Sequence, residues 1–490
     1  MYYLCGQITI PSKQKGMKEN IIGREVEKEI LSQIYASGQA EFVAIYGRRR
    51  VGKTFLVREF FEGDLVFQVS GMANAGTQEQ LKSFYHTLKR YDSSAKAIPS
   101  DWLDAFDMLI AYLASLGEGR KVLFIDELPW FDTQGANFVS ALEHFWNGWA
   151  SARRDIVLFV CGSATSWMMN KLINNHGGLY GRLTRRIALA PFTLGEAYRF
   201  VASRGISLPP YEMAEAYMIM GGIPYYLQML DARLSLAQNI DRLCFNPNGE
   251  LYDEFPILYR SLFADSELYM KVVECLHLRG YGMTRNEISE ASGLKSGKTL
   301  TTILENLTAC GFIRQYVNYG CSTRKSLYQL IDFFTLFHFR FMRESSFRNL
   351  LFWSNIQRTP RFYAWAGISF EILATTHIPQ MKQRLGITGV ATNEYSWRSR
   401  NTEETEGAQI DLVIERADNT LNICEMKFSE TEYAITQEYD KTLRQKIAAF
   451  VAQTKTRKSV QLTMVTTYGL KRTIYSGSVQ SEIVLDDLFK

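Results

Sequence analysis

The spacing of hydrophobic residues in the N-terminal third of the chain predicts strands that alternate with helices. Three apolar runs have the length of buried strands, at residues 41–46, 121–125 and 155–161. A glycine-containing loop follows the first run, and apolar residues at helical spacing come next. These helical positions are Phe55, Leu56, Val57 and Phe60. The pattern predicts an α/β fold with a strand, a loop and a helix in direct succession.

The middle of the chain has helical periodicity in three consecutive segments, at residues 266–279, 285–292 and 298–310. Two stretches with alternating apolar and polar residues follow, at 312–317 and 325–330, as in a hairpin. Thr284 and Glu287 have the spacing of a capping box. We interpret residues 263–345 as a winged helix-turn-helix, a module that either contacts DNA or connects neighbouring domains.

A second hairpin is predicted near the C-terminus, where apolar residues alternate at 410–414 and 421–428 around a turn near Asp418. This turn brings Asp411 opposite Glu425, and Lys427 points to the same side as Glu425 because strand side chains alternate between faces. Two carboxylates beside a lysine form a candidate site for a divalent metal ion, with the lysine placed to position water or to offset phosphate charge.

Composition changes this picture little. The chain has 490 residues, of which 46% are hydrophobic and 22% charged, so we expect several globular domains. No apolar run reaches the length of about 18 residues that spans a bilayer, so we expect a soluble protein with no membrane contact. Seven scattered cysteines favour a reducing cytoplasm over disulfides or structural zinc. The net charge of +4 permits contact with nucleic acid, and we expect residues 1–19 to be a dispensable extension, with Met17 as a second candidate start.

The loop after the first strand has the spacing Gly-x4-Gly-Lys-Thr of a Walker A phosphate loop. We expect Lys53 to reach the β and γ phosphates of ATP and Thr54 to bind Mg²⁺. The backbone N–H groups of the loop and the N-terminus of the next helix suit phosphate. The predicted nucleotide-binding residues of this segment are Gly47, Arg48, Arg49, Arg50, Val51, Gly52, Lys53, Thr54 and Phe55.

Acidic and polar residues stand at the ends of the other two predicted strands. Asp126 and Glu127 follow the second strand, where Asp126 is expected to hold Mg²⁺ and Glu127 to activate water for hydrolysis. Ser163 follows the third strand, where a polar side chain can sense the γ phosphate. Further on, Arg182 is a candidate finger or sensor for transition-state charge, and in an oligomer it can act on a neighbouring subunit.

These motifs resemble, in order and spacing, those of the archaeal-type P-loop ATPases, a family close to AAA+ and STAND proteins. The resemblance covers residues 20 to about 230 and includes the segments at 22–25, 46–54, 125–127, 162–163, 180–182 and 221–224. It implies that Gly23 and Arg24 lie near the adenine, and that the segment ending at Pro224 couples nucleotide state to movement of a helical lid.

The Asp411 and Glu425-x-Lys427 pattern resembles the core of PD-(D/E)XK nucleases, a restriction-endonuclease-like α/β fold. This resemblance implies Glu371 as a third acidic ligand, together with Asp411 and Glu425, for Mg²⁺ or Mn²⁺. Gln409 stands where the family usually has an acidic residue. We therefore predict a P-loop core (20–195), a helical lid (196–262), the winged helix (263–345) and a nuclease-like domain (346–490).

The combined expectation is an ATP-hydrolysing protein that can form a homo-oligomer. Its nucleotide cycle is expected to regulate a metal-dependent nuclease that acts on nucleic acid, with DNA favoured. The alternative is a nucleotide-switched DNA-binding or signalling protein with an inactive nuclease fold. A helicase-like motor is disfavoured because no tandem motor core is present in the sequence.

Overall fold

The computed structural model describes residues 20–173, 178, 179, 181–322, 325–343, 349–399 and 408–490. The chain divides into two compact units, with the boundary in the sequence between Ala190 and Pro191. The N-terminal extension and Tyr180, which were part of the sequence predictions, lie outside the described residues.

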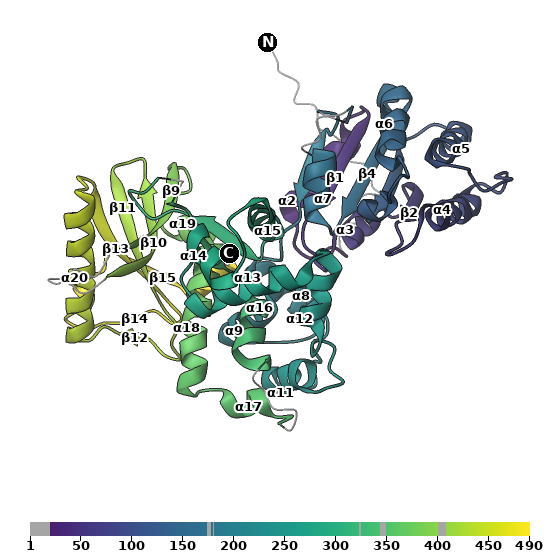
Figure 1. Cartoon of the computed structure of the whole chain (residues 1–490). Coiled ribbons are helices and arrows are strands. Elements are labelled where there is room, and N and C mark those ends of the chain that lie inside the picture. The colour runs from purple at the N-terminus through teal and green to yellow at the C-terminus, as the bar shows by residue number, and fades with distance from the viewer. Residues whose placement is uncertain (1–19, 174–177, 180, 323–324, 344–348, 400–407) are drawn as a thin grey trace, which may run out of the picture. The chain divides into compact units, whose positions relative to one another are not determined.

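The first unit is built on a five-stranded parallel sheet with the strand order β2-β3-β4-β1-β5. Strands β1, β2 and β4 are labelled in Figure 1. Its strands are β1 (Glu41–Tyr46), β2 (Leu65–Ser70), β3 (Lys121–Asp126), β4 (Ile156–Gly162) and β5 (Arg185–Ala188). The three strands predicted from apolar runs are confirmed as β1, β3 and β4. Because β4 lies between β1 and β3, the ends of these three strands meet at one edge of the sheet.

The helices of the first unit are α2 (Glu25–Ala36), α3 (Lys53–Phe60), α4 (Thr77–Tyr91), α5 (Trp102–Ser115), α6 (Phe138–Gly148) and α7 (Thr165–Trp167). Aromatic side chains from α4, α5 and α6 form a core with apolar residues of the sheet. Trp102 packs edge-on against Phe138 with ring centroids 4.9 Å apart, and Phe106 stacks on Phe145 at 5.1 Å. This packing holds the sheet rigid behind the loops at its carboxyl edge.

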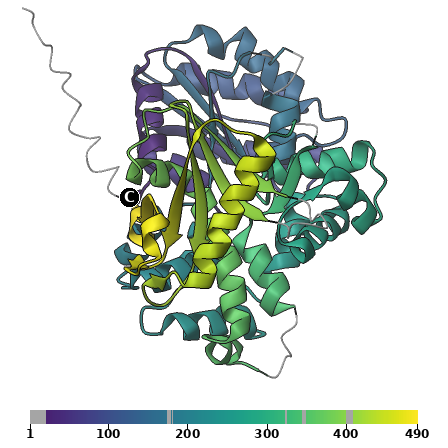
Figure 2. The same cartoon turned by 90° about the vertical axis from the view of Figure 1, so that its left-hand side faces the viewer.

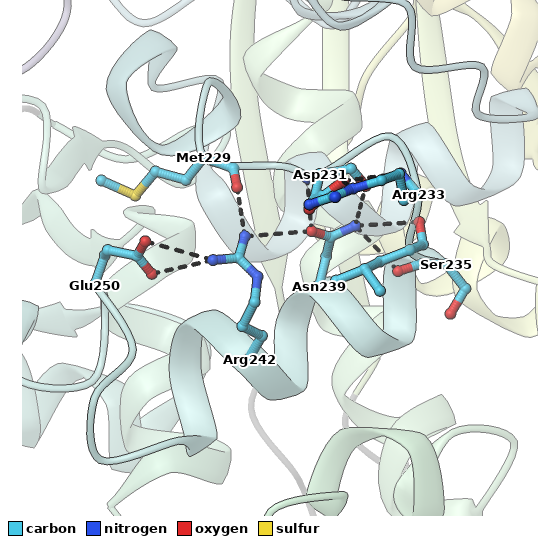
Figure 3. Close-up of polar contacts among 8 residues, drawn as sticks. Met229, Asp231, Arg233, Ser235, Asn239, Arg242 and Glu250 are labelled. Carbon is cyan, nitrogen blue, oxygen red and sulfur yellow. Dashed lines mark hydrogen bonds and ion pairs between the residues drawn. The ribbon is translucent and has the colours of Figure 1, made fainter.

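The second unit begins with helices α8 (Leu194–Ser203), α9 (Pro210–Met220), α10 (Pro224–Leu227), α11 (Leu236–Ile240) and α12 (Glu254–Leu262). A turn between α9 and α10 requires glycine at Gly222, where φ is +64° and a Cβ atom would collide with the carbonyl oxygen of Phe192. The loop after α10 is fixed by Asn239, whose amide donates to the backbone carbonyls of Asp231 and Ser235 at 3.0 and 3.1 Å (Figure 3). Arg242 donates to the carbonyl of Met229 in the same network.

The middle of the second unit contains α13 (Ser266–Arg279), β6 (Met283–Thr284), α14 (Arg285–Ser292), α15 (Lys298–Ala309), β7 (Ile313–Tyr316) and β8 (Leu327–Leu330). The three predicted helices and the hairpin are confirmed, and β8 lies between β6 and β7 in a small antiparallel sheet. The predicted capping box is present, because Thr284 N–H donates to Glu287 Oε2 at 2.7 Å and Glu287 N–H donates to Thr284 Oγ1 at 3.3 Å.

The last part of the second unit contains a mixed sheet. Helices precede its strands along the chain, and a further helix lies between two of the strands. The helices are α16 (Phe333–Phe337), α17 (Phe352–Ile356), α18 (Pro360–Thr376), α19 (Ile378–Arg384) and α20 (Gln437–Thr454). The strands are β9 (Thr392–Arg398), β10 (Gln409–Arg416), β11 (Thr420–Lys427), β12 (Tyr433–Ala434), β13 (Ser459–Thr466), β14 (Leu470–Lys471) and β15 (Ser481–Val484).

The five-stranded C-terminal sheet has the order β15-β13-β11-β10-β9. Strands β9, β10 and β11 are antiparallel, which confirms the predicted hairpin, whereas β11, β13 and β15 are parallel. The long helix α20 makes the crossover from β11 to β13 and lies against the sheet (Figure 2). Leu443 and Phe450 of α20 are buried against apolar residues of the strands.

Candidate functional site

The Walker A loop connects β1 to the first turn of α3. Gly47 has φ +141°, and a Cβ atom there would collide with the carbonyl oxygen of Leu189, so only glycine fits this bend. Lys53 is buried, and its ammonium group donates to the carbonyls of Gly47 and Arg48 at 2.9 Å each. The lysine is therefore held inside the curve of the loop, next to the N-terminus of α3, where phosphate is favoured.

Thr54 and Asp126 are in direct contact, although they come from different elements. The Thr54 hydroxyl donates to Asp126 Oδ2 at 2.8 Å. The other carboxylate oxygen, Oδ1, accepts from the N–H of Glu127 at 2.9 Å and from the thiol of Cys161 at 2.6 Å. A hydroxyl and a carboxylate beside a phosphate loop are the oxygen ligands that suit Mg²⁺, so these residues fit the predicted ion.

Glu127 is held in place by Ser163, which stands at the end of the neighbouring strand β4. Glu127 has φ +47°, a left-handed conformation that turns the chain sharply at the end of β3. Its carboxylate oxygen Oε2 accepts from the Ser163 hydroxyl at 2.9 Å and from the Ser163 N–H at 3.1 Å. The predicted base and the predicted sensor are thus joined to each other.

The other residues predicted to contact the nucleotide differ in how far they are exposed to solvent. Arg24 is buried, and its guanidinium donates to the carbonyl of Val51 at 3.1 Å, so it contacts the Walker A loop directly. Arg49 and Phe55 are exposed. Arg182 is also exposed, and no residue in the described ranges is a hydrogen-bond partner of its guanidinium. Pro224 begins α10 in the second unit.

The C-terminal hairpin brings Asp411 and Glu425 together. The pairing of the two strands ends with Leu412 opposite Cys424, one position before Asp411 and Glu425, and these two carboxyls interact electrostatically. Glu425 is buried and accepts from Lys446 of α20 at 3.0 and 3.1 Å and from the Tyr439 hydroxyl at 2.6 Å. Lys427 lies 3.1 Å from the same carboxylate.

The electrostatics of this cluster differ from one carboxyl to the next. Burial and the neighbouring Asp411 raise the pKa of Glu371, and burial and Glu425 raise the pKa of Asp411. Burial acts in the same direction on Glu425, but Lys427 and Lys446 outweigh it and lower the pKa of Glu425. Burial thus disfavours the charged form of Glu371 and Asp411, whereas the charge of Glu425 is stabilised by two lysines.

The predicted metal ligands Glu371, Asp411 and Glu425 do not form a ready-made metal site. Within the described part of the chain, no group of three His, Cys, Asp or Glu side chains is arranged to hold an ion. The physical reason is visible at Glu425, whose oxygens are engaged by Lys427, Lys446 and Tyr439.

Sequence reasoning missed several contacts of these two sites. Cys161 and Tyr439 carry no motif, yet each donates to a predicted site carboxylate. The basic residues between Lys441 and Val460 are predicted from the sequence to form either a phosphate-facing surface or a solvated helix face. Lys446 of this run pairs with Glu425. Arg444 and Lys458 of the same run also form ion pairs, with Asp440 and Glu415 at 2.8 Å.

The first of these sites lies in the part of the chain that is similar to known ATPase domains. Residues 21–230 match the model of an ATPase domain found predominantly in Archaea. An uncharacterized protein of Methanocaldococcus jannaschii is 26% identical over 323 residues, which cover 66% of this chain and 68% of that protein. An uncharacterized ATP-binding protein of the same organism is 37% identical over 49 residues, 10% of this chain and 83% of that one. Residues 21–230 are thus similar to the ATPase domains found predominantly in Archaea.

Solved structures that the chain matches include the Walker-type ATPase of Pyrococcus abyssi. That structure has a TM-score of 0.46 and 19% sequence identity, and the match covers 65% of this chain and 96% of that one. The ORC2 protein of Aeropyrum pernix in its ADPNP–ADP complexes has a TM-score of 0.40 and 15% identity, over 74% of this chain and 98% of that one.

In the described ranges, no helix combines the length and the apolar character needed to cross a membrane.

Proposed function

We propose that the chain binds Mg²⁺–ATP in the Walker A loop and hydrolyses it. The observation that carries this proposal is the direct contact of Thr54 with Asp126, at 2.8 Å, beside the buried Lys53. Because β1, β4 and β3 are neighbours, the phosphate loop, the acidic pair and Ser163 lie at one edge of the sheet. The archaeal ATPase domain over residues 21–230 supports the same assignment.

Each residue of this edge has a role that follows from its chemistry. Lys53 offers a point charge to the β and γ phosphates, while Thr54 and Asp126 would hold Mg²⁺, which neutralises phosphate charge when bound. Glu127 accepts the proton of the attacking water and orients it. Arg182 is exposed, which suits a finger that acts on the site of a neighbouring copy in a homo-oligomer.

The test is steady-state ATP turnover by Lys53→Ala and by Arg58→Ala as the matched control. Both substitutions remove one positive side chain from α3, but Lys53 is buried in the loop and Arg58 is exposed. The proposal predicts that turnover disappears in Lys53→Ala and persists in Arg58→Ala. Wild-type turnover by Lys53→Ala would contradict the nucleotide site.

We further propose that the C-terminal sheet acts on nucleic acid, with DNA favoured, and that the ATP cycle regulates it. The observation that favours this second function is the convergence of Asp411, Glu425 and Lys427 at the open end of the hairpin. The middle segment, read as a winged helix, would connect the two functions or hold DNA. Since the three acids do not form a ready-made ligand set, the alternative of an inactive, recognition-only fold stays open.

Cleavage assays distinguish these alternatives. Labelled single- and double-stranded DNA and RNA are incubated with Mg²⁺ or Mn²⁺, with and without ATP, and wild type is compared with Asp411→Ala and Lys427→Ala. Asp418→Ala is the control, because Asp418 lies in the exposed turn of the same hairpin. Cleavage that is lost in the first two variants alone supports the nuclease. No cleavage under any condition, with ATP turnover intact, supports the recognition-only fold.

A further inference from the structure

A cavity of about 620 Å³ opens inside the second unit, between the middle segment and the C-terminal sheet. Its walls come from α13, β7, α18, β9 and β10. Glu371 and Asp411 line it, so the cavity adjoins the carboxylate cluster of the hairpin. Its volume lies within the range of about 300–1,000 Å³ that is typical of small-molecule and cofactor sites.

Several arginine side chains line the cavity. The guanidinium-bearing residues of its wall are Arg279, Arg314, Arg340 and Arg398. In the part of the chain that the structure describes, none of the four forms an ion pair with a carboxylate. Three carboxylates, Glu287, Glu371 and Asp411, also line the cavity and interact electrostatically with Arg279, Arg314 and Arg398. Because no direct ion pair with a described residue engages the four guanidinium groups, their N–H donors remain available to an anionic ligand, and phosphate suits their planar, bidentate geometry best.

Aromatic rings accompany two of these arginines. The guanidinium of Arg314 lies 5.0 Å from the ring centroid of Tyr316, and that of Arg398 lies 4.5 Å from the ring centroid of Tyr281. Trp365 also lines the cavity, and its buried indole N–H has no hydrogen-bond partner among the described residues. Flat aromatic and guanidinium surfaces stack on nucleobases, and an unused N–H donor invites an acceptor from a ligand.

The wall of the cavity is well supported. Asn318, just after β7, forms a parallel bridge with Ser396 of β9, and the Ser396 hydroxyl donates to Asn318 Oδ1 at 2.8 Å. Arg314 is itself oriented, since its Nε–H donates to Gln329 Oε1 at 2.8 Å. The middle segment and the C-terminal sheet are thus tied together at this point, so the cavity is a formed feature of the second unit.

We propose that this cavity binds a nucleotide unit, with its phosphate against Arg314 and its base against the aromatic rings. Glu371 and Asp411 offer acceptors for sugar hydroxyls or base amino groups. The ligand is either a free nucleoside monophosphate or the 5′-phosphorylated end of a nucleic-acid strand, because the two share this chemistry. The inference deepens the proposed action of the C-terminal sheet on nucleic acid and adds Arg314 of the middle segment to that site.

The test is calorimetric binding of thymidine 5′-monophosphate and of a 5′-phosphorylated thymidine tetranucleotide to the full chain. The variants are Arg314→Gln in the cavity and Arg398→Gln at its exposed edge, with Lys271→Gln as the control. Lys271 is an exposed cation of α13 that does not line the cavity. Thermal melting of each variant identifies any that fail to fold, and Arg398→Gln keeps the test decisive if Arg314→Gln does not fold.

The proposal predicts that either arginine variant weakens binding by about tenfold or more, because a charge-assisted contact to phosphate is lost, while Lys271→Gln binds as wild type. Lys53→Ala tests whether the probes bind in this cavity or in the Walker A loop, and this variant is expected to keep the binding.

Binding that is lost in Lys53→Ala but kept in both arginine variants would overturn the inference, as would the absence of binding of both probes to wild type. If wild type binds the tetranucleotide but not the monophosphate, the ligand is the 5′-phosphorylated end of a strand. If it binds both probes, a free nucleotide is also a ligand. ATP turnover, measured in parallel, reports independently on the proposed ATPase.

Discussion

The carboxylate of Glu127 accepts two hydrogen bonds from Ser163, one from its hydroxyl at 2.9 Å and one from its backbone N–H at 3.1 Å. The two residues lie at the ends of β3 and β4, which are neighbours in the sheet. A base that must orient water loses catalytic power when its carboxylate is free to rotate. In the proposed mechanism, Ser163 would therefore position Glu127.

The first prediction concerns this contact. Ser163→Ala removes the hydroxyl but keeps the backbone N–H, so one of the two hydrogen bonds is lost. A hydrogen bond worth about 1 kcal/mol corresponds to about a fivefold decrease in kcat, with little change in the KM for ATP. Steady-state kinetics check this, and Ser163→Thr, which keeps a hydroxyl, is expected to restore most of the rate. A decrease confined to KM would show that Ser163 contacts the nucleotide instead.

The second prediction concerns Cys161, whose thiol donates to Asp126 Oδ1 at 2.6 Å. Burial raises the pKa of Cys161 well above its ordinary value, so the thiol stays protonated and remains a donor. Cys161→Ala leaves that buried oxygen without this donor and is expected to lower the free energy of unfolding by about 1–3 kcal/mol. Urea denaturation of the variant measures this.

Cys161→Ser is the matched variant for that experiment, because its hydroxyl donates in place of the thiol. We expect it to be more stable than Cys161→Ala. Equal stability of the two variants would show that the contact contributes packing alone.

The third prediction concerns pH and the buried Glu215 of α9. Burial raises the pKa of Glu215 from 4.5 to about 7, although its carboxylate accepts from Trp353 Nε1 and Gln357 Nε2 at 3.1 and 2.8 Å. The folded protein thus binds a proton that the unfolded chain has released, so the free energy of unfolding falls as the pH rises from about 4.5 to about 7.

Glu215→Gln removes this titration while keeping the shape of the side chain. We expect the variant to match wild type near pH 5 and to exceed its stability above pH 7, by up to about 3 kcal/mol. Chemical denaturation at the two pH values measures the difference, and Glu267→Gln, which removes an exposed carboxylate of α13, controls for the loss of one carboxylate. A gain that is equal at both pH values would refute the assigned titration.

The elements of both sites could be predicted from the sequence because their signals are local. The spacing from Gly47 to Thr54, the acidic pair at the end of β3 and the turn near Asp418 each depend on a few neighbouring residues. The apolar residues along 410–414 and 421–428 likewise indicate the paired strands β10 and β11.

The contacts around the site carboxylates could not be predicted because they depend on the order of strands and on helix placement. Cys161 reaches Asp126 only because β4 lies beside β3, and nothing in its own segment indicates that order. Tyr439 and Lys446 reach Glu425 because α20 packs on the sheet, which turns an apparent phosphate surface into internal ion pairs. The arginine cavity likewise depends on docking of the middle segment at Asn318 and Ser396.

Glu127 is proposed to carry out hydrolysis at a site that Lys53, Thr54 and Asp126 assemble. The most direct measurement is ATP turnover and ATP retention by Glu127→Gln with Mg²⁺, compared with wild type. The account predicts that turnover falls by at least about 100-fold, because a general base is lost, while the variant still binds ATP and retains it unhydrolysed. Turnover near the wild-type rate in this variant would contradict the account.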